Sequence, residues 1–375
     1  MSLALLLSLI TAAPGPSGAP RFRPIAALIE QGIRRGIYPG AVVVIGRRDS
    51  VLYSHGFGRV TWARRGVTPS PETTRWDLAS LTKVVATTSA LLVLVDRGAV
   101  DLEAPVARYL PRFVGLGRER ITVRMLLNHT SGLAPYVPFY RLATTREGAI
   151  DLLYQAVPVR PPGSVATYSD LNAILLGLLV ESVSGEPLDA YAYREVFAPL
   201  GLAATVFAPS LAAPMSVAPS RTVSGRPMPG RVNDENAFRL GGVAGHAGLF
   251  STGADLARFA QVWLRGGLIS TGSWVRPATL QEFLRRTPES GTRALGWDTP
   301  EFAGPHPSVF GALADGETYG HTGWTGTMLW IDPAHDLFLV FLTNRSLEPR
   351  ARRSMSALRS LRTGLSDLVI RAARR

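Results

Sequence analysis

The order of predicted elements indicates an α/β (α+β) fold, in which an antiparallel sheet is flanked by N- and C-terminal helices and carries an all-helical insertion domain. Runs of strand-forming residues lie near both ends of the 375-residue chain, beside amphipathic helices, and the strand signal fades between them. One sheet must therefore be built from both ends, so the first and last thirds are expected to fold together. The predicted sheet domain comprises 21–98 and 237–375, and the predicted helical domain 99–236.

The first third is predicted to form a helix, a hairpin and a second, buried helix. Apolar residues recur at helical spacing over 25–35, and a glycine then ends that helix. Strand-forming runs at 41–45 and 51–60 flank turn residues and predict the hairpin. A long helix is expected from Asp77, its N-cap, to Arg97. Because its apolar residues lie all round, it should occupy the centre of the molecule.

The middle and the end of the chain supply the remaining predicted elements. Helical segments separated by Pro and Gly are expected at 123–127, 147–156, 171–183 and 188–197, and a further helix at 254–264. Two strand runs, 327–331 and 337–343, predict a second hairpin, and a helix over 355–372 has an apolar stripe that can cover a sheet face. A cleft between the sheet and the helical insertion is the natural place for a site.

The amino-acid composition excludes several classes of site and partner. Hydrophobic residues make up 46% and charged residues 18%, which is typical of a globular protein rather than a disordered one. The absence of cysteine excludes a disulfide scaffold, a thiolate nucleophile, a cysteine-ligated zinc and an iron–sulfur cluster. The net charge of +12 comes from scattered arginines without an aromatic-interleaved basic stripe, so no nucleic-acid partner is predicted. Loose association with an anionic cell envelope would suit this charge.

The first 20 residues resemble a secretory signal. An apolar run at 3–10 precedes small residues and then a stretch rich in Pro, Gly and Ser, although a basic start is lacking. We therefore expect export to the periplasm or the outside of the cell, the alternative being a cytoplasmic protein whose N-terminal segment is not a signal. No later stretch approaches the roughly 18 uninterrupted apolar residues that predict a spanning helix.

Lys83 is the only lysine among the 40 Lys and Arg residues. Arginine stays protonated in proteins, whereas a desolvated lysine can lose its proton, so a position that keeps lysine can need that chemistry. Ser80 lies three residues earlier, on the same helical face, and places a hydroxyl nucleophile beside an amine base. The alternative is that one lysine survived by chance, and a Ser-x-x-Lys pattern alone is weak.

Two further signals follow in order. Tyr168-Ser169-Asp170 lies in a turn running into a helix, and His321-Thr322-Gly323 lies just before the third predicted strand. With Ser80-x-x-Lys83, these triplets have the order and separation of the three motifs of the serine β-lactamase and penicillin-binding protein superfamily. Three further stretches strengthen the likeness, at 121–133, 168–177 and 241–250.

The chain thus resembles the class C-like branch of that superfamily, the β-lactamase-related serine hydrolases, from about residue 25 to the C-terminal helix. The resemblance implies a β-lactamase/transpeptidase-like fold with the active serine between the two domains. It implies that Ser80 is the acylated nucleophile, Lys83 its activator, and Tyr168 the general base that later activates water. The backbone N–H groups of Ser80 and Trp324, the residue after Gly323, would form the oxyanion hole.

Two residues depart from the pattern of the penicillin-recognising members. Asp170 replaces an asparagine, and His321 replaces the lysine that holds the substrate carboxylate in those members. Histidine is mostly neutral at pH 7, so a fixed positive charge is lost. The sequence therefore favours an esterase or a DD-peptidase-like hydrolase over an efficient β-lactamase. The alternative is a penicillin-binding-like sensor or binding module without turnover.

The expected substrate is a small molecule or a peptide: an ester, an amide or a D-amino-acid peptide. No cofactor and no metal are predicted, because the H-E-x-x-H pattern of zinc hydrolases is missing. His129 and His246, which lie in turns of family-like stretches, are interpreted as structural residues. The sequence does not specify the substrate, the base of the deacylation step or the oligomeric state.

Overall fold

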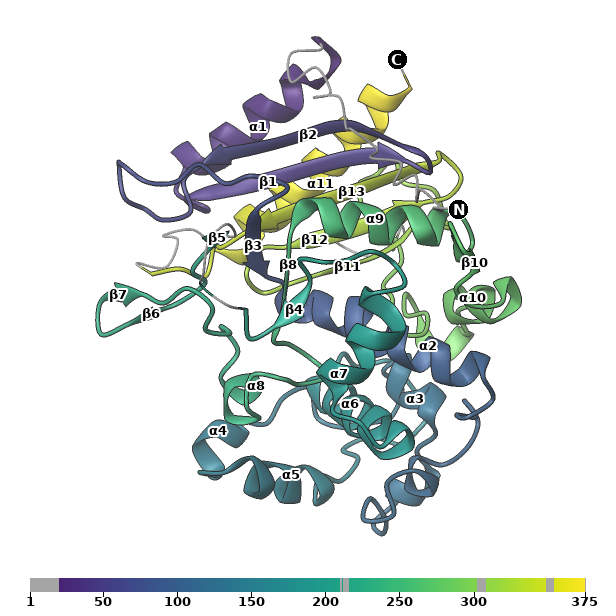
Figure 1. Cartoon of the computed structure of the whole chain (residues 1–375). Helices are drawn as coiled ribbons and strands as arrows, with labels where there is room; N and C mark the ends of the chain where they lie inside the picture. Colours follow the sequence, from purple (N-terminus) through teal and green to yellow (C-terminus); the bar gives the residue numbers. More distant parts are fainter. Residues whose placement is uncertain (1–19, 210, 212–215, 302–307, 349–353, 375) are drawn as a thin grey trace, which may run out of the picture.

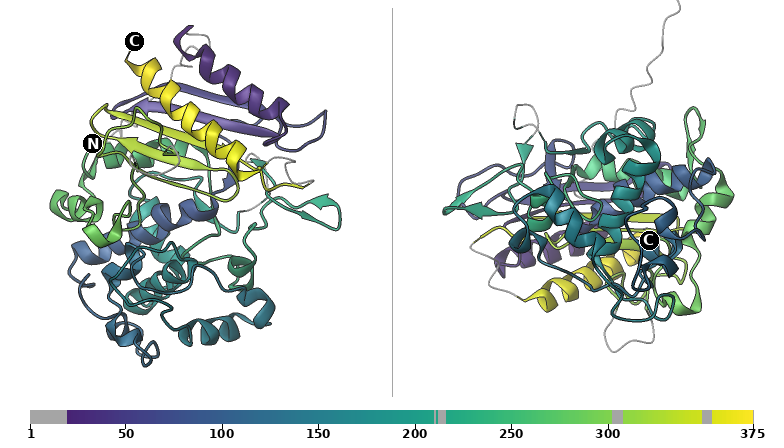
Figure 2. Two further views of the ribbon diagram at one scale, coloured as in Figure 1. Left: turned by 180° about the vertical axis from the view of Figure 1, so that it is seen from behind. Right: turned by 90° about the horizontal axis from the view of Figure 1, so that it is seen from below.

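The computed structural model describes residues 20–209, 211, 216–301, 308–348 and 354–374, and Figure 1 shows their arrangement. The signal-like segment predicted for the first 20 residues lies outside this part of the chain, apart from Pro20. An antiparallel sheet forms one layer of the molecule, and helices cover both of its faces and fill the region beside it (Figures 1 and 2). The predicted α/β fold class is confirmed.

The main sheet joins the two ends of the chain. Its five antiparallel strands follow the order β11-β12-β13-β1-β2. The central contact pairs β1 with β13, from Ala41 opposite Thr343 to Gly46 opposite Phe338. The first and last thirds therefore form one sheet, as expected. The strand bounds are β1 (Gly40–Arg47), β2 (Ser50–Gly58), β11 (Tyr319–Thr322), β12 (Met328–Asp332) and β13 (Leu337–Thr343).

Helices cover both faces of this sheet (Figure 2). The helices α1 (Arg23–Arg34) and α11 (Met355–Ala373) pack side by side on one face, and α9 (Gly253–Leu264) packs on the other. Residues of β1 alternate between the two sides, since Val43 belongs to the core under α1 and α11, and Val44 to the core under α9. The flanking helices predicted at the two ends are confirmed.

The region beside the sheet is mainly helical. Its helices are α2 (Ser89–Asp96), α3 (Val123–Leu127), α4 (Phe139–Leu142), α5 (Arg146–Tyr154), α6 (Asp170–Ser184), α7 (Leu188–Ala192), α8 (Glu235–Arg239) and α10 (Pro277–Leu284). Short strands also occur here, which the sequence did not predict: β4 (Val206–Phe207), β5 (Ser216–Val217), β6 (Thr222–Val223), β7 (Arg226–Pro227), β9 (Leu268–Ile269) and β10 (Gly272–Ser273). The domain limits at 98/99 and 236/237 stay a prediction.

The segment predicted as one long helix from Asp77 is divided. Asp77 ends β3 (Thr74–Asp77), which pairs with β8 (Leu249–Ser251) in a second, small sheet. A 3₁₀ turn (Ala79–Leu81) and a π-helical turn (Lys83–Thr88) then lead into α2. The expectation that Asp77 caps a helix was wrong, because pairing with a distant strand decides its conformation. By length and composition Ala79–Asp96 could cross a membrane, but 83% of this window is buried inside the protein.

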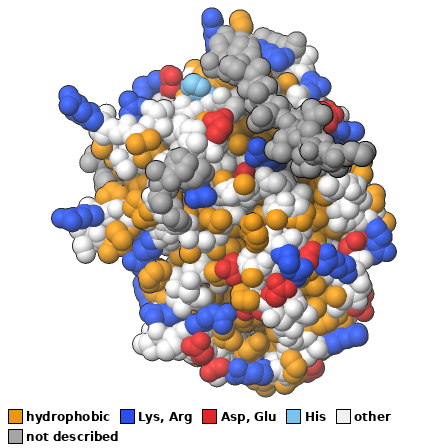
Figure 3. Space-filling model, in the orientation of Figure 1, with side chains coloured by type: hydrophobic (Ala, Val, Ile, Leu, Met, Phe, Trp, Pro, Cys, Tyr) orange, Lys and Arg blue, Asp and Glu red, His pale blue; other side chains and the backbone are white. Residues whose placement is uncertain are grey.

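Basic side chains are dispersed over the face shown in Figure 3, with acidic side chains among them. This mixture on the surface agrees with the scattered arginines of the sequence. A long-range field of one sign, which would attract a polyanion, needs such charges gathered on one face.

Candidate active site

The turn before Ser80 is held by a buried carboxylate. Ala79 has a left-handed backbone conformation, with φ +47°, and its N–H donates a hydrogen bond to Oδ1 of Asp77 at 2.9 Å. The other oxygen of Asp77 accepts from the Ser220 hydroxyl at 2.9 Å and from the Asn233 N–H at 2.7 Å. Burial raises the pKa of Asp77 to about 6 despite these donors. The positive φ therefore lies where three hydrogen bonds fix the chain next to Ser80.

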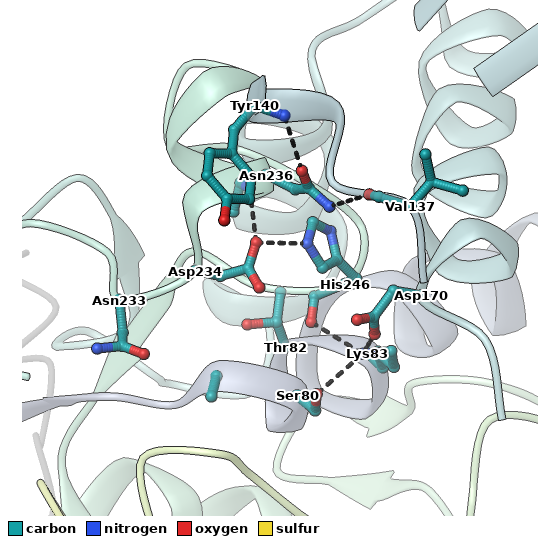
Figure 4. Close-up of polar contacts among 12 residues, drawn as sticks. Ser80, Thr82, Lys83, Val137, Tyr140, Asp170, Asn233, Asp234, Asn236 and His246 are labelled. Carbon is teal, nitrogen blue, oxygen red and sulfur yellow. Dashed lines mark hydrogen bonds and ion pairs between the residues drawn. The ribbon is translucent and has the colours of Figure 1, made fainter. Parts of the chain in front are cut away.

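Ser80 and Lys83 lie in direct contact, one turn apart, as Figure 4 shows. The Nζ of Lys83 donates a hydrogen bond to Oγ of Ser80 at 2.9 Å and another to the carbonyl oxygen of His246 at 3.2 Å. It also lies 2.8 Å from Oδ1 of Asp170, the first residue of α6. Three elements therefore place the hydroxyl, the amine and the carboxylate together.

The charge state of Lys83 differs from the expectation. Burial does lower the pKa of this amine, as the sequence argument assumed. The charge of Asp170, followed by the electrostatic effect of Tyr168 and hydrogen bonds to both residues, opposes burial and outweighs it, so the pKa of Lys83 lies above its ordinary value. Lys83 is thus an ammonium ion-paired with Asp170, and the prediction of a readily deprotonated amine was wrong. The reason is the charge of Asp170, which an asparagine would not carry.

Tyr168 lies between the ammonium and two histidines. Its ring centre is 4.9 Å from Nζ of Lys83, 4.8 Å from the His129 ring and 5.8 Å from the His321 ring. The N–H of Ser169 donates to Nδ1 of His129 at 3.2 Å, which fixes the backbone beside Tyr168. Burial, followed by the positive charge of Arg293, holds the pKa of both histidines well below the ordinary value. Both rings are therefore neutral partners of the tyrosine.

His321 and Gly323 belong to the edge of the main sheet. His321 lies before β12, which is the third predicted strand, and within β11, a strand that the sequence did not predict. Its Nδ1 is 2.9 Å from the carbonyl oxygen of Thr322, so the N–H is at Nδ1 and the Nε2 lone pair is an acceptor. Within the described residues this buried Nε2 has no hydrogen-bond partner. In the turn that follows β11, Trp324 is 52% exposed.

A histidine–carboxylate contact behind Lys83 was missed by the sequence analysis. Nε2 of His246 lies 2.8 Å from Oδ1 of Asp234, and Figure 4 shows both residues above the Ser80–Lys83 pair. Burial opposes ionisation of Asp234, but the charge of His246 and its hydrogen bond outweigh burial and lower the pKa of Asp234 to about 2. Asp234 also caps α8 by accepting the N–H of Ala237. The interpretation of His246 as structural fits this position, because its carbonyl oxygen holds the ammonium.

The structure brings Ser80, Lys83, Tyr168, Asp170 and His321 to one place between the sheet and the helical region. Gly323 and Trp324 adjoin them through the turn after β11. Two charged residues near the site, Asp234 and Arg293, were not predicted, because neither lies in a recognisable pattern. In the described ranges no group of three or more His, Asp or Glu side chains could hold a metal ion.

Comparisons with known proteins agree with this arrangement. The model of the Beta-lactamase family matches residues 25–362. A Salmonella schwarzengrund protein, described provisionally as a D-alanyl-D-alanine carboxypeptidase, is 35% identical over 307 residues, covering 74% of this chain and 71% of that protein. The same description and identity hold for a Salmonella typhi protein.

Solved structures share the fold. A penicillin-binding protein homologue from Caulobacter crescentus has a TM-score of 0.74 at 20% identity and covers 94% of this chain and 98% of its own. EstCE1, described as a hydrolase with promiscuous acyltransferase activity, has a TM-score of 0.71 at 23% identity, covering 93% and 98%. The resemblance noted in the sequence is thus confirmed by the family match, which spans most of the chain. The chain belongs to the Beta-lactamase family and is a serine hydrolase of the serine β-lactamase and penicillin-binding protein superfamily.

Proposed function

We propose that Ser80 is the nucleophile of an acyl-enzyme hydrolase whose substrate is an ester, an amide or a D-amino-acid peptide. The observation that carries the proposal is the contact of Ser80 Oγ with Lys83 Nζ at 2.9 Å, where Asp170 at 2.8 Å fixes the ammonium. A serine hydroxyl is unreactive at its free pKa and needs a partner that takes its proton. The neighbours of Ser80 supply such a partner.

The proton of Ser80 passes to Tyr168 in this proposal. An ammonium has no lone pair, so Lys83 in its ion pair cannot accept a proton while it is charged. It instead donates to Oγ of Ser80 and keeps the attacking oxygen in place. As Oγ bonds to the substrate carbonyl carbon, Tyr168 acts as a phenolate and takes the proton of Oγ. The resulting phenol then gives this proton to the leaving group as the bond between that group and the carbonyl carbon breaks. In the second half, the phenolate of Tyr168 takes a proton from water while the water oxygen bonds to the acyl carbon. The phenol then returns the proton to Oγ of Ser80 as the acyl–Oγ bond breaks, which restores both residues.

The developing oxyanion would be held by two backbone N–H groups, those of Ser80 and Trp324. The turn after β11 lies against the turn of Ser80, since the hydroxyl of Thr327 donates to the carbonyl oxygen of Leu78 at 2.9 Å. Donors that are fixed before the reaction stabilise the tetrahedral intermediate, each by about 3 kcal/mol.

Two kinds of observation indicate the substrate class: the residues at which this chain departs from the penicillin-recognising members, Asp170 and His321, and the descriptions of its relatives. His321 is neutral, so it cannot supply the charge that holds the carboxylate in penicillin-recognising members. Ester and D-amino-acid peptide hydrolysis are therefore favoured over efficient β-lactam hydrolysis. The Salmonella relatives, described as carboxypeptidases, and EstCE1, described as a hydrolase, support these two classes. Export to the periplasm or the cell exterior would bring the chain to peptide substrates of the envelope.

A second candidate function is a sensor that is acylated without turnover. The change from asparagine to Asp170 favours it, because the ion pair at 2.8 Å withdraws Lys83 from proton transfer and leaves activation of water to Tyr168 alone. Both candidates share acylation of Ser80 and differ only in the release of the acyl group.

The experiment combines mass spectrometry with a substrate panel. We expect a fluorophosphonate to add to the protein and to be lost in Ser80→Ala, but retained in Ser182→Ala, a control at an exposed position of α6. Chromogenic esters, D-aminoacyl anilides and a chromogenic cephalosporin are then compared side by side, and hydrolysis of an ester or anilide with multiple turnovers is expected. Acylation without release would establish the sensor, and acylation that persists in Ser80→Ala would overturn both candidates.

A further inference from the structure

The segment that carries His246 supplies one partner of the Lys83 ammonium. The carbonyl oxygen of His246 accepts from Nζ of Lys83 at 3.2 Å, in addition to the contacts of Nζ with Ser80 and Asp170. Unlike those two partners, this oxygen belongs to the backbone, so its place depends on what fixes the segment. If the carbonyl moved, the ammonium could turn away from Oγ of Ser80. The contacts of His246 therefore bear on the geometry of the nucleophile.

The side chain of His246 is oriented by Asp234. The imidazole is 1% exposed, and its Nε2 lies 2.8 Å from Oδ1 of Asp234. An ionised carboxylate only accepts hydrogen bonds, so Nε2 carries the proton of this contact. The other ring nitrogen, Nδ1, is buried and has no hydrogen-bond partner within the described residues. In this part of the chain the orientation of the ring thus depends on Asp234.

Asp234 belongs to a stretch that reaches both ends of the catalytic turn. The N–H of Asn233 donates to Oδ2 of Asp77 at 2.7 Å, and the carboxylate of Asp77 holds the turn before Ser80. Asp234, the next residue, acts at the other end of that turn, behind Lys83. Figure 4 shows Asn233 and Asp234 on the same side of the Ser80–Lys83 pair. Two adjacent residues are therefore placed to fix the nucleophile and the ammonium together.

We propose that Asp234 is a positioning residue for acylation, which holds His246 and thereby keeps the ammonium of Lys83 against the hydroxyl of Ser80. This inference rests on the proposed function. A catalytic contact must be kept to within a fraction of an ångström, and a partner that is itself fixed by a hydrogen bond meets this need better than a free segment does. Asp234 needs no contact with the substrate for this role.

A purely structural role would have a different signature. As the N-cap of α8, Asp234 accepts from the Ala237 N–H at 2.8 Å, and serine fills such a position as well as aspartate does. The segment of His246 also has a second support, because the Thr87 hydroxyl donates to the carbonyl oxygen of Gly245 at 2.7 Å. If capping were the whole role, or if this support sufficed, a variant that caps α8 without reaching His246 would be fully active.

The test compares two substitutions that both remove the charge of Asp234. Asp234→Asn keeps an oxygen that can accept from Nε2 of His246 and from the helix N–H. Asp234→Ser keeps a cap for α8, but its shorter side chain does not reach the ring. His335→Ala is the matched control. It breaks a second histidine–aspartate contact, 2.8 Å between Nδ1 of His335 and Oδ2 of Asp332, at the end of β12 away from the turn after β11.

The first readout is the rate of acylation. We expect kcat/KM for a chromogenic ester to fall about 10- to 100-fold in Asp234→Ser, the scale of a displacement of about 1 Å at a catalytic centre, but less than about threefold in Asp234→Asn. His335→Ala should match the unmodified protein. Circular dichroism checks that each variant is folded. If Asp234→Ser does not fold, His246→Gln and His246→Leu test the same contact from the other side. Glutamine keeps a donor for Asp234 and leucine does not, so the larger loss is then expected in the leucine variant.

The second readout is the position of Lys83 itself. Because the chain has one lysine, protein labelled with carbon-13 lysine gives a single set of lysine signals in a magnetic resonance spectrum. The Nζ of Lys83 lies 4.9 Å from the centre of the Tyr168 ring, so the ring current of the tyrosine shifts the signal of the adjacent methylene group. We expect this signal to move toward that of a free lysine in Asp234→Ser, to move less in Asp234→Asn, and to stay in place in His335→Ala.

Two results would overturn the inference. Equal rates in Asp234→Asn and Asp234→Ser, whether high or low, would show that the contact with His246 does not matter. A lysine signal that stays in place in Asp234→Ser would show that Lys83 is held without it. Failure of the proposed function looks different, since unmodified protein would then show no ester hydrolysis that depends on Ser80. The lysine signal, measured without substrate, would still show whether Asp234 positions Lys83.

Discussion

Asp170 has a carboxylate oxygen where the asparagine of many superfamily members has an amide nitrogen. This one difference changes the charge that faces Lys83. An amide at this position could accept a hydrogen bond from Lys83 without charge, whereas the carboxylate forms an ion pair with Nζ at 2.8 Å. The side chains of Lys83 and Asp170 are 4% and 19% exposed, so each charge depends on the other for compensation. The protonation state of Lys83 is therefore decided at residue 170.

Asp170→Asn should move the pH dependence of acylation. The pKa of Lys83 is raised in the native protein, so the ammonium is kept until the pH rises through that value. Removal of the carboxylate lowers this pKa, and if the ammonium form is active, the alkaline limb of kcat/KM moves to lower pH. Ester hydrolysis between pH 5 and 11 measures the effect. The control is Asp151→Asn, which removes a surface partner of Arg112.

The opposite result would assign a different role to Lys83. If Asp170→Asn raises the rate at neutral pH and moves the acidic limb downward, the neutral amine is the working base, and the ion pair restrains it in the native protein. An unchanged profile would contradict the view that Asp170 controls Lys83.

Among the residues of the site, the sequence predicted those that lie close to one another along the chain and missed those that stand alone in loops. Ser80 with Lys83, and Tyr168 with Asp170, lie within three residues of each other, so the structure places each pair as the spacing indicated. Arg293 and Asp234 reach the site through loops whose conformation depends on remote contacts. No local pattern marks them, since single charged residues in loops are common.

Three elements meet at the turn after β11. The turn of Ser80 is tied to it by the Thr327 hydroxyl, which donates to the Leu78 carbonyl oxygen. From α11, the buried guanidinium of Arg362 donates to the carbonyl oxygens of Gly323 at 2.9 Å and Thr327 at 2.8 Å. Burial, with two neighbouring arginines, lowers the pKa of Arg362 to about 9, so it remains charged at neutral pH. The C-terminal helix therefore helps to fix the proposed oxyanion hole.

Gly323→Ala should push the turn after β11 away from the turn that carries Ser80. A Cβ at this position would lie 2.1 Å from Oγ1 of Thr327 and 2.6 Å from the carbonyl oxygen of Leu78, and the latter is backbone that cannot rotate away. We expect kcat/KM to fall by about 100-fold, the scale of a displacement of about 1 Å at a catalytic centre, with a loss of stability of about 1–3 kcal/mol. Ester hydrolysis and urea denaturation measure the two effects.

Gly316→Ala is the matched control for this variant, because a Cβ there meets nothing within 4 Å. It should retain the activity of the unmodified protein. Undiminished activity of Gly323→Ala would show that the turn after β11 can move without harm, and thus that its N–H group is not a fixed donor.

The elements that the sequence predicted are those with long apolar patterns. The strands β12 and β13 and the helices α9 and α11 were expected within one or two residues of their bounds. The strands β3, β8 and β11 were missed, because each has only three or four residues and is defined by its partner in the sheet. The same cause explains the wrong helix at Asp77. Since β3 and β11 both border the site, the missed strands are the ones that position its residues.

At the scale of the molecule, one hydrophobic core links the sheet to the helical region. It includes Val42 and Val44 of β1, Val340 of β13, and residues of α6 such as Leu175 and Leu179. Because the central strands come from opposite ends of the chain, the helical region is inserted between halves that need each other. The site lies where this core meets the sheet edge, so its geometry depends on both regions.

Unfolding in urea should therefore occur as one transition. All seven tryptophans lie outside 99–236, so their fluorescence reports mainly on the rest of the chain, with Trp274 also in contact with Glu195. Far-ultraviolet circular dichroism reports the helices of 99–236 as well. We expect the two signals and the loss of ester hydrolysis to share one midpoint, since a shared core couples both regions. Leu175→Ala, in the helical region, should shift all three midpoints together, by about 2–5 kcal/mol in free energy of unfolding. A shift of the dichroism midpoint alone would contradict the coupling and show that 99–236 unfolds as an independent unit.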